Sequence, residues 1–255
     1  MIRIAKAAVA TSVQDGGRRA HRAEGFARSG AMDLLSLTLA NRVAGASPES
    51  AGIEFGPGAA SFEITADVRM AFGGAQRDGA PWWETIEATR GTVFELSAPR
   101  DGVWSYLAVG GGAEAPVVLG SRSTNVREEI GRWLTAGDVL TSGADHANPV
   151  RIEEPPMHGE IRLFGKLPGH WRTGLRADRM GYVLEGEPLR SGTGSAWSEP
   201  LLPGFIQVPP GGLPIVLMAE GPTVGGYPVP AVVHSEDVRL VAQSPPGTTL
   251  TFVSS

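Results

Sequence analysis

Five polar, glycine-rich stretches hold the residue types that could do chemistry in this 255-residue chain. They are SVQDGGRR (12–19), RSGAMD (28–33), GGGAEAPVVLGSRST (110–124), ADRMGY (177–182) and PGFIQVPPGGLPIVLMAEGPTVGGYPVP (203–230). Each couples glycine, whose backbone N–H groups can approach a ligand closely, with an arginine, aspartate, serine or threonine that could hold one. Because binding residues concentrate in loops on a rigid scaffold, we expect the functional site in these stretches.

A single stretch of this kind also has a purely structural explanation. In a β protein, an arginine beside a glycine more often bonds the carbonyls of a neighbouring turn than an anionic ligand. The histidines are scattered without ligand-like spacing, which favours solvated or hydrogen-bonded side chains over a metal site: His21, His146, His158, His170 and His234. We interpret the tryptophans at 82, 83, 104, 133, 171 and 197 as core or interface residues rather than as a stacking platform.

The composition and charge exclude several classes of function. With 22 basic and 27 acidic residues the net charge is −5, and no run of like charge occurs, which argues against nucleic-acid and membrane-surface partners. The absence of cysteine excludes disulfides, thiolate metal sites and a cysteine nucleophile. The chain has no apolar run of signal-peptide or membrane-spanning length, so we expect a cytoplasmic protein. It also lacks the Walker-type GxxxxGK[ST], GxSxG and HExxH patterns.

The elements that must position these stretches are mainly strands. The 35 glycines and 20 prolines are spread along the chain, which is typical of short strands and turns in a sandwich or barrel. Alternation of apolar and polar residues predicts strands at 61–66, where Phe62 and Ile64 face inward, and at 92–98. More uniformly apolar segments predict further strands at 103–109, 214–220, 238–242 and 248–253.

One segment, residues 29–45, departs from the β pattern. Apolar residues recur there at the spacing of a helix: Met32, Leu35, Leu39 and Val43. Asp33 stands where it can support the first turn, and Gly45 stands where a helix C-cap belongs. The sequence therefore predicts a mainly β protein with one helix in its N-terminal half.

A polar, proline-rich stretch at 142–160 separates two strand-rich halves of the chain. Polar and proline-rich linkers are where domain boundaries commonly fall. We therefore predict an N-terminal β unit at residues 1–150 and a C-terminal β unit at residues 151–255. The two halves show no convincing sequence repeat.

Taken in order, the polar stretches form a pattern that covers nearly the whole chain. Its parts are SVQDGGR (12–18), RSGAMD (28–33), Asn41, Glu54, GSRST (120–124), DRMGY (178–182), PGFIQVPPGGLPI (203–215) and TVGGYP (223–228). This order resembles the C subunit of bacterial 5-oxoprolinase. The family is also called allophanate hydrolase subunit 2, KipA-like, or the biotin-dependent carboxyltransferase domain of urea carboxylase. The resemblance implies two cyclophilin-like β-barrel units.

The resemblance also implies partners and an activity. It implies a heteromeric complex with the B subunit, a KipI-like companion. In the 5-oxoprolinase system a third component, the A subunit, also takes part, and ATP hydrolysis drives opening of the lactam 5-oxoproline to glutamate. ATP, with Mg, would then act at the level of the complex. We expect an apolar interface with the companion, anchored by Trp82, Trp83 and Trp133.

Two alternatives to a 5-oxoprolinase-type hydrolase remain open. The first is carboxyl transfer from carboxybiotin to urea or a urea-like amide. The chain has no biotinyl-lysine context and no carboxylase domain, so another polypeptide would carry the biotin. The second is a non-catalytic, KipA-like regulatory subunit that acts by antagonising a kinase inhibitor.

Both chemistries must polarise a poorly reactive amide or ureido group and stabilise charge that develops on oxygen. Guanidinium groups and glycine-rich backbone suit that task, and carboxylates suit the orientation of N–H groups. The predicted catalytic residues are Arg122, Arg179, Asp178 and Tyr182, with Asp178 holding Arg179 or accepting from substrate. The predicted residues that bind a small amide or lactam are Gln14, Asp15, Ser29, Asp33, Ser121, Ser123, Thr124, Gln207, Thr223, Gly225, Gly226 and Tyr227.

The chain departs from the family pattern just ahead of the GGYP motif. Relatives usually carry an acidic residue, then a glutamine and two threonines, where residues 220–224 of this chain read EGPTV. A basic residue commonly follows GGYP, and Val229 stands there instead. The segment 163–176 is also shorter than usual. Since these changes remove hydrogen-bonding groups, we expect a divergent member with altered substrate preference or weak activity on 5-oxoproline.

Overall fold

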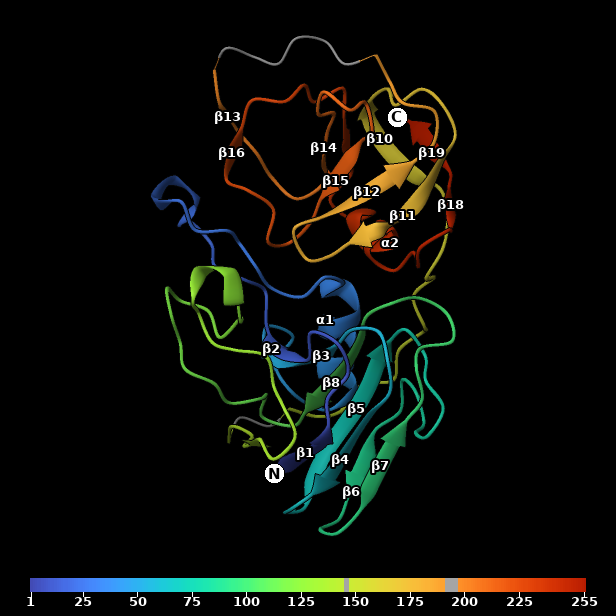
Figure 1. Cartoon of the computed structure of the whole chain (residues 1–255). Coiled ribbons are helices and arrows are strands. Elements are labelled where there is room, and N and C mark those ends of the chain that lie inside the picture. Colours follow the sequence, from blue (N-terminus) through green and yellow to red (C-terminus); the bar gives the residue numbers. More distant parts are fainter. Residues whose placement is uncertain (145–146, 191–196) are drawn as a thin grey trace. The chain divides into compact units, whose positions relative to one another are not determined.

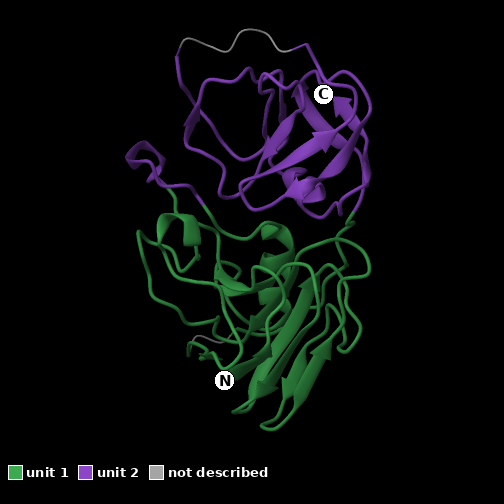
Figure 2. Ribbon diagram, viewed as in Figure 1, with its two compact units in different colours: residues 1–19, 29–157 green, residues 20–28, 158–255 purple. Residues whose placement is uncertain are grey.

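The computed structural model describes residues 1–144, 147–190 and 197–255 (Figure 1). The chain divides into two units (Figure 2). Unit 1 comprises residues 1–19 and 29–157, and unit 2 comprises residues 20–28 and 158–255. The division falls inside the proline-rich stretch 142–160, beyond the position of 150 proposed from the sequence. No local sequence signal marks residues 20–28 as part of the C-terminal unit.

Unit 1 contains two sheets and the long helix. One sheet has the order β7-β4-β1-β9, formed by β7 (Val93–Leu96), β4 (Ala60–Ile64), β1 (Ile2–Lys6) and β9 (Val139–Leu140). The other has the order β2-β3-β8-β5-β6, formed by β2 (Ser12–Gln14), β3 (Gly52–Phe55), β8 (Ser105–Val109), β5 (Val68–Gly74) and β6 (Ile86–Ala88). All strand pairs in both sheets are antiparallel.

The strands of unit 1 follow the apolar pattern of the sequence. In β4, Phe62 and Ile64 are buried while Glu63 between them is partly exposed, as alternation predicts. Every residue of β8 is buried, which confirms the interpretation of 103–109 as a strand covered on both faces. Phe62 stacks on Phe94 of β7 with ring centroids 5.3 Å apart, so the core lies where the inward faces meet.

The predicted helix is α1 (Leu34–Val43). Asp33 is its N-cap, and its carboxylate accepts hydrogen bonds from the backbone N of Ser36 at 3.0 Å and from its hydroxyl at 2.6 Å. Gly45 follows the helix with φ at 69°, the left-handed conformation expected beyond a C-terminus. The buried face differs from the predicted one, because Leu35 is exposed and polar Asn41 is buried.

Unit 2 is built on one sheet of eight strands, in the order β18-β11-β12-β15-β14-β17-β10-β19. These are β10 (Ile161–Gly165), β11 (Trp171–Ala177), β12 (Gly181–Glu185), β14 (Phe205–Gln207), β15 (Ile215–Leu217), β17 (Ala231–Val233), β18 (Thr249–Leu250) and β19 (Phe252–Ser254). Only Thr251 separates the two edge strands in sequence, and its carbonyl accepts from Ile161 N at 2.8 Å. The chain thereby joins the edges of the sheet into a nearly closed barrel, and the mainly β prediction is confirmed.

Two smaller features complete the described fold. A separate two-stranded sheet in unit 2 pairs β13 (Glu199–Pro200) with β16 (Val224–Gly225). Two single-turn 3-10 helices, η1 (Arg22–Glu24) and η2 (Val126–Glu128), interrupt loops in unit 2 and unit 1 respectively. Among the described residues, no helix is both long enough and apolar enough to span a bilayer.

The prediction of a strand at 238–242 is wrong, because this segment is the helix α2 (Val238–Ala242). Five residues are too few for periodicity to separate a strand from a helix. A neighbouring ion pair anchors the residue before this helix. Asp237, just before the helix, accepts from Arg162 Nε at 2.7 Å and from its Nη2 at 2.8 Å, which fixes the start of the turn against β10.

The tryptophans predicted as interface anchors lie mostly in the chain's own core. Trp83 is only 9% exposed, so its assignment to a partner interface is wrong. Trp82 stacks on Phe72 with ring centroids 5.1 Å apart, and its Nε1 donates to the carbonyl of Gly74 at 2.9 Å. Trp82 and Trp133 are both partly exposed.

Candidate functional site

Asp15, in the turn after β2, is the centre of a polar cluster in unit 1. Its Oδ1 accepts from the hydroxyls of Ser121 and Ser123, both at 2.6 Å, and its Oδ2 accepts from the backbone N of Arg122 at 2.7 Å. The backbone N of Gly17 donates to Oδ1 at 2.8 Å. Burial raises the pKa of Asp15, but these hydrogen bonds outweigh it and hold the pKa below its ordinary value. The carboxylate therefore stays ionised and fixes the GSRST loop.

Glycine lets the first two motifs meet backbone to backbone. A Cβ at Gly30 would lie 2.9 Å from the backbone N of Gly17 and 3.0 Å from the carbonyl O of Asp15. Gly30 also has φ at 89°, in the left-handed region. The N–H of Ala31 donates to the Asp15 carbonyl at 3.0 Å. The contact between motifs 12–19 and 28–33 thus depends on the absence of a side chain at position 30.

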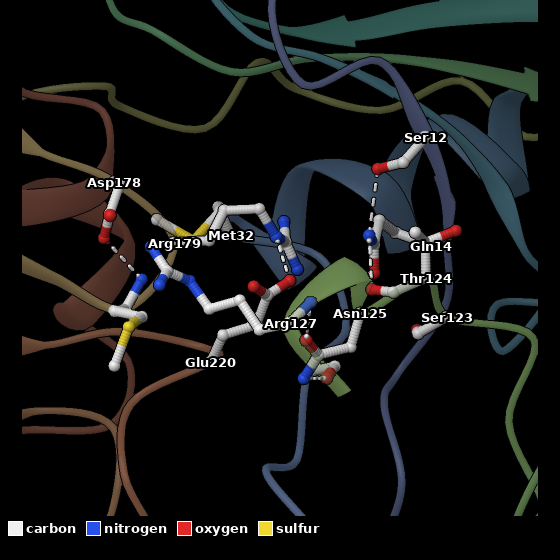
Figure 3. Close-up of polar contacts among 12 residues, drawn as sticks. Ser12, Gln14, Met32, Ser123, Thr124, Asn125, Arg127, Asp178, Arg179 and Glu220 are labelled. Atoms are coloured by element: carbon white, nitrogen blue, oxygen red, sulfur yellow. Dashed lines mark hydrogen bonds and ion pairs between the residues drawn. The ribbon is translucent and has the colours of Figure 1, made fainter. Parts of the chain in front are cut away.

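Gln14 is fully buried and joins β2 to the same loop (Figure 3). Its Nε2 donates to Ser12 Oγ at 2.9 Å and to the carbonyl of Thr124 at 3.2 Å. The backbone N of Thr124 returns a bond to the Val13 carbonyl at 3.0 Å. Among the described residues the Gln14 Oε1 has no hydrogen-bond partner. A buried acceptor of this kind is costly, and a ligand N–H would satisfy it.

Asp33 belongs to a second buried set of bonds, around Glu54. The Oε2 of Glu54 accepts from Met32 N at 2.8 Å and from the Tyr106 hydroxyl at 2.9 Å. Asp33 N donates to the same hydroxyl at 2.7 Å. Burial, together with the charges of Glu54 and Asp33, raises the pKa of Tyr106 far above its ordinary value, so the phenol remains a neutral donor.

Two further contacts place the remaining residues of this motif. Asn125 Nδ2 donates to Ser29 Oγ at 3.0 Å, which connects RSGAMD to the residue after GSRST. Ser29 has φ at 56°, a conformation that residues other than glycine rarely adopt. Neither Tyr106 nor Asn125 was predicted from the sequence. Tyr106 was missed because it lies in the segment 103–109, which was interpreted only as an apolar strand. Asn125 was missed although it directly follows the GSRST motif.

The backbone N of Arg122 bonds Asp15, whereas its side chain bonds Glu114 and Ala115. Its Nη1 donates to the carbonyl of Ala115, and its Nη2 lies 3.1 Å from Glu114 Oε2. The Arg122 side chain is 31% exposed and that of Glu114 is 42% exposed. Ion pairs this accessible to water are weak. The guanidinium can therefore exchange Glu114 for another anionic oxygen at little cost.

In unit 2, the DRMGY motif buries an ion pair (Figure 3). Arg179 Nε lies 2.5 Å from Glu220 Oε1, and both side chains are at most 4% exposed. The backbone N of Glu220 also donates to the Arg179 carbonyl at 2.8 Å. Asp178 is exposed and accepts from Met180 N at 2.8 Å within its own turn. The carboxylate of Glu220 is therefore a partner of Arg179.

The other predicted residues of unit 2 lie on strands or on the separate two-stranded sheet. Tyr182 on β12 is buried and donates to the carbonyl of Ala242 at 2.8 Å, which ties the barrel to α2. Gln207 on β14 is 5% exposed, and its Nε2 has no partner among the described residues. A Cβ at Gly225 would lie 2.8 Å from that nitrogen. Tyr227 is 49% exposed.

The structure thus groups the predicted residues by unit. In unit 1 the mutually bonded residues are Gln14, Asp15, Ser121, Ser123 and Thr124. In unit 2, Gln207 packs on Gly225, while the backbone carbonyl of Thr223 accepts from Leu201 N at 2.9 Å. No group of three or more potential metal ligands occurs among residues 1–144, 147–190 and 197–255. His146 lies outside these residues.

Comparison with known proteins matches almost the whole chain. The family described as "Carboxyltransferase domain, subdomain A and B" matches residues 24–167 and 163–254. The chain belongs to this family. It is 34% identical over 284 residues to the 5-oxoprolinase C subunit of Escherichia coli (strain K12), covering 99% of this chain and 91% of that protein. The corresponding protein of Haemophilus influenzae is 31% identical over 269 residues.

Other similar proteins are longer than this chain. The urea amidolyase of Saccharomyces cerevisiae is 27% identical over 293 residues, which span 95% of this chain and 16% of that enzyme. The crystal structure of TTHA0988 superposes with a TM-score of 0.89 at 33% identity, covering 99% of this chain. This chain spans 56% of the TTHA0988 chain. The urea amidolyase structure from K. lactis, at 24% identity and a TM-score of 0.85, shows the shared fold alone.

Proposed function

We propose that this carboxyltransferase-domain protein is one component of a heteromeric, ATP-dependent 5-oxoprolinase-type amidohydrolase. It acts with a companion B subunit, and with an A subunit, to open the lactam of 5-oxoproline and yield glutamate. The observation that carries this proposal is the length of the match. The alignment with the 5-oxoprolinase C subunit spans 91% of that protein, whereas the alignment with yeast urea amidolyase spans only 16% of a larger enzyme.

The polar cluster of unit 1 has the chemistry that lactam opening demands. The carbonyl oxygen of an amide gains negative charge as the bond is attacked, and a guanidinium stabilises such charge. Arg122 supplies that group once its exposed pair with Glu114 opens. Gln14 Oε1 is a buried acceptor for the lactam N–H. Asp15 holds the GSRST side of the cluster in place, because its carboxylate fixes the Arg122 backbone and the serines on either side.

As part of this proposal, we assign nucleotide binding to the partner proteins. A phosphate group favours a helix N-terminus with free backbone N–H groups. The N-terminus of α1 is capped by the carboxylate of Asp33, which already bonds Ser36 N and would repel phosphate. The other α-helix in the described part of the chain, α2, has only five residues. The chain also lacks a GxxxxGK[ST] loop. These features support the proposal that ATP and Mg act elsewhere in the complex.

The second candidate function is carboxyl transfer from carboxybiotin on another polypeptide to a urea-like amide. The similarity to urea amidolyase favours it. The deciding experiment reconstitutes the purified chain with its companion proteins. We expect 5-oxoproline to stimulate ATP hydrolysis, with one glutamate formed for each ATP hydrolysed. Carboxylation of urea that requires biotin would replace this proposal with the second function. Binding of the companion without either activity would point to a regulatory, KipA-like role.

A further inference from the structure

Residues 20–28 form a small excursion whose flanking residues belong to unit 1 but which itself belongs to unit 2. The excursion is compact. Its single-turn helix η1 is closed by Gly25, whose N–H donates to the Arg22 carbonyl at 3.0 Å. The N–H of Phe26 donates to the His21 carbonyl at 3.2 Å. The excursion therefore has a fixed shape of its own from which a side chain can reach.

The side chain that reaches out is that of Arg22. Its Nη2 donates to the carbonyl of Leu201 and, at 2.9 Å, to the carbonyl of Pro222. These two carbonyls lie 179 and 200 residues further along the chain. Leu201 directly follows β13, and Pro222 lies two residues before β16. One guanidinium thus holds both strands of the separate two-stranded sheet.

That sheet needs support of this kind. It consists of two strands of two residues each, and it forms no ladder with the eight-stranded sheet among the described residues. A two-stranded ribbon is at best marginally stable by itself. Its inner side packs through the buried Leu201, whose Cδ1 would lie 2.6 Å from a Cβ at Gly225. Its outer side exposes Val224, at 55%. The ribbon therefore gains much of its fixed position from bonds to its carbonyls.

We propose that Arg22 is the positioning residue of this ribbon. The ribbon and its flanking residues carry Thr223, Gly225, Gly226 and Tyr227, four of the five unit 2 residues predicted to bind substrate. By bonding two carbonyls with one planar group, Arg22 sets their position without touching the reacting atoms. Lysine cannot reproduce this, because an ammonium group lacks the fixed fork of a guanidinium. The catalytic consequence rests on the proposed function, whereas the structural role does not.

Amide hydrogen exchange of the full-length chain tests the structural role. Arg22→Met keeps the apolar stem and removes the donors. We expect exchange at Leu201 N, which bonds the Thr223 carbonyl, to become about tenfold faster. Exchange in the eight-stranded sheet should stay unchanged, and Arg22→Lys should fall between the two. Arg19→Met is the matched control, because Arg19 is exposed and three residues away. Unchanged exchange at Leu201 in Arg22→Met would overturn the proposal.

Kinetics of the reconstituted complex test the consequence. We expect Arg22→Met to raise KM for 5-oxoproline about tenfold while kcat changes less than about twofold, with partial recovery in Arg22→Lys. Faster exchange with unchanged KM would refute the link between the ribbon and substrate. If the unmodified complex fails to turn over 5-oxoproline, the proposed function falls, and the exchange result still decides the structural role. If Arg22→Met does not fold, the exchange rates of Arg22→Lys decide it.

Discussion

The turns after β2 in unit 1 and after β11 in unit 2 both begin with an aspartate, but they are connected to the rest of their units by different kinds of contact. Asp15 and Asp178 each directly follow a strand, and each accepts a backbone N–H from two residues further on, at 2.8 Å in both turns. In unit 1 the same carboxylate also takes three hydrogen bonds from residues 121–123. In unit 2 the next residue, Arg179, forms a long-range ion pair with Glu220.

The difference shows two ways to fix a loop with one charge. The Asp15 carboxylate stays ionised because neutral groups, the serine hydroxyls and backbone N–H groups, donate hydrogen bonds to it. Arg179 is too deeply buried for that and needs an opposite charge, since an unpaired buried ion is very costly. The first arrangement leaves Arg122 partly exposed beside the cluster. In the second arrangement, Arg179 is buried in an ion pair with Glu220. We therefore expect Arg122 to act on substrate and Arg179 to hold the fold.

The largest expected effect comes from breaking the ion pair of unit 2. Glu220→Ala leaves the Arg179 charge buried without its carboxylate, which typically costs about 3–5 kcal/mol. We expect unit 2 to unfold at a clearly lower urea concentration. The double substitution Arg179→Met with Glu220→Leu removes both charges and should recover most of the loss. A single variant as stable as the unmodified protein would show that water reaches Arg179.

The next effect separates the two arginines by activity. Arg122→Ala removes the group that stabilises charge on the substrate oxygen, and we expect a loss of about 2–4 kcal/mol in transition-state stabilisation. Because its pair with Glu114 is exposed, unfolding by urea should change by less than about 1 kcal/mol. Turnover of 5-oxoproline per folded molecule measures the first, and circular dichroism measures the second. An unfolded Arg122→Ala protein with normal turnover in its folded fraction would reverse the assignment.

A smaller effect is expected where the two turns are compared directly. Asp15→Asn keeps the shape but replaces one acceptor oxygen with a donor, so some of the bonds from Ser121, Ser123 and Arg122 are lost. We expect about 2–3 kcal/mol of destabilisation of unit 1. Asp178→Asn, which affects an exposed turn, should cost less than about 1 kcal/mol. Equal costs for the two variants would contradict the distinction between the turns.

The stabilisation from Asp15 should also depend on pH in one direction. The pKa of Asp15 is lowered in the folded chain from its ordinary value of 3.8, so its ionised form is favoured by folding. Its contribution is therefore complete above the ordinary pKa and is lost as pH falls through the lower folded value. Asp237 behaves similarly, since its pKa is also lowered, chiefly by Arg162. The useful measurement is thus the stability difference between the unmodified protein and Asp15→Asn, which should shrink below about pH 4.

The sequence predicted the features that depend on local pattern, but not those that depend on contacts between distant residues. Alternation predicted β4 and its buried Phe62, and a capping pattern predicted α1 with Asp33 at its start. The strand expected at 238–242 is a helix, and the residue before it, Asp237, bonds Arg162, which lies 75 positions away in the sequence. The motifs of the site were recognisable from their order. Their pairing was not, because Ser121 lies 106 residues from Asp15 and no local signal joins them.

The smallest structural effect is expected in the altered loop before GGYP. Val224 is 55% exposed, so Val224→Thr removes no core packing and should leave stability within about 0.5 kcal/mol. Pro222 is held through its carbonyl by Arg22, and a side-chain change there leaves that bond in place. The polar groups present in relatives can thus be restored without disturbing the ribbon.

The triple variant Pro222→Gln, Val224→Thr and Val229→Lys tests whether this loop sets substrate preference. Each missing polar contact to a small lactam typically costs about 1–3 kcal/mol. We therefore expect kcat/KM for 5-oxoproline to rise at least about tenfold in the reconstituted complex. The control is Val93→Thr, an exposed valine on β7 in unit 1, which should change nothing. Ordinary turnover by the unmodified protein, with no gain in the triple variant, would mean that these positions have drifted without contacting substrate.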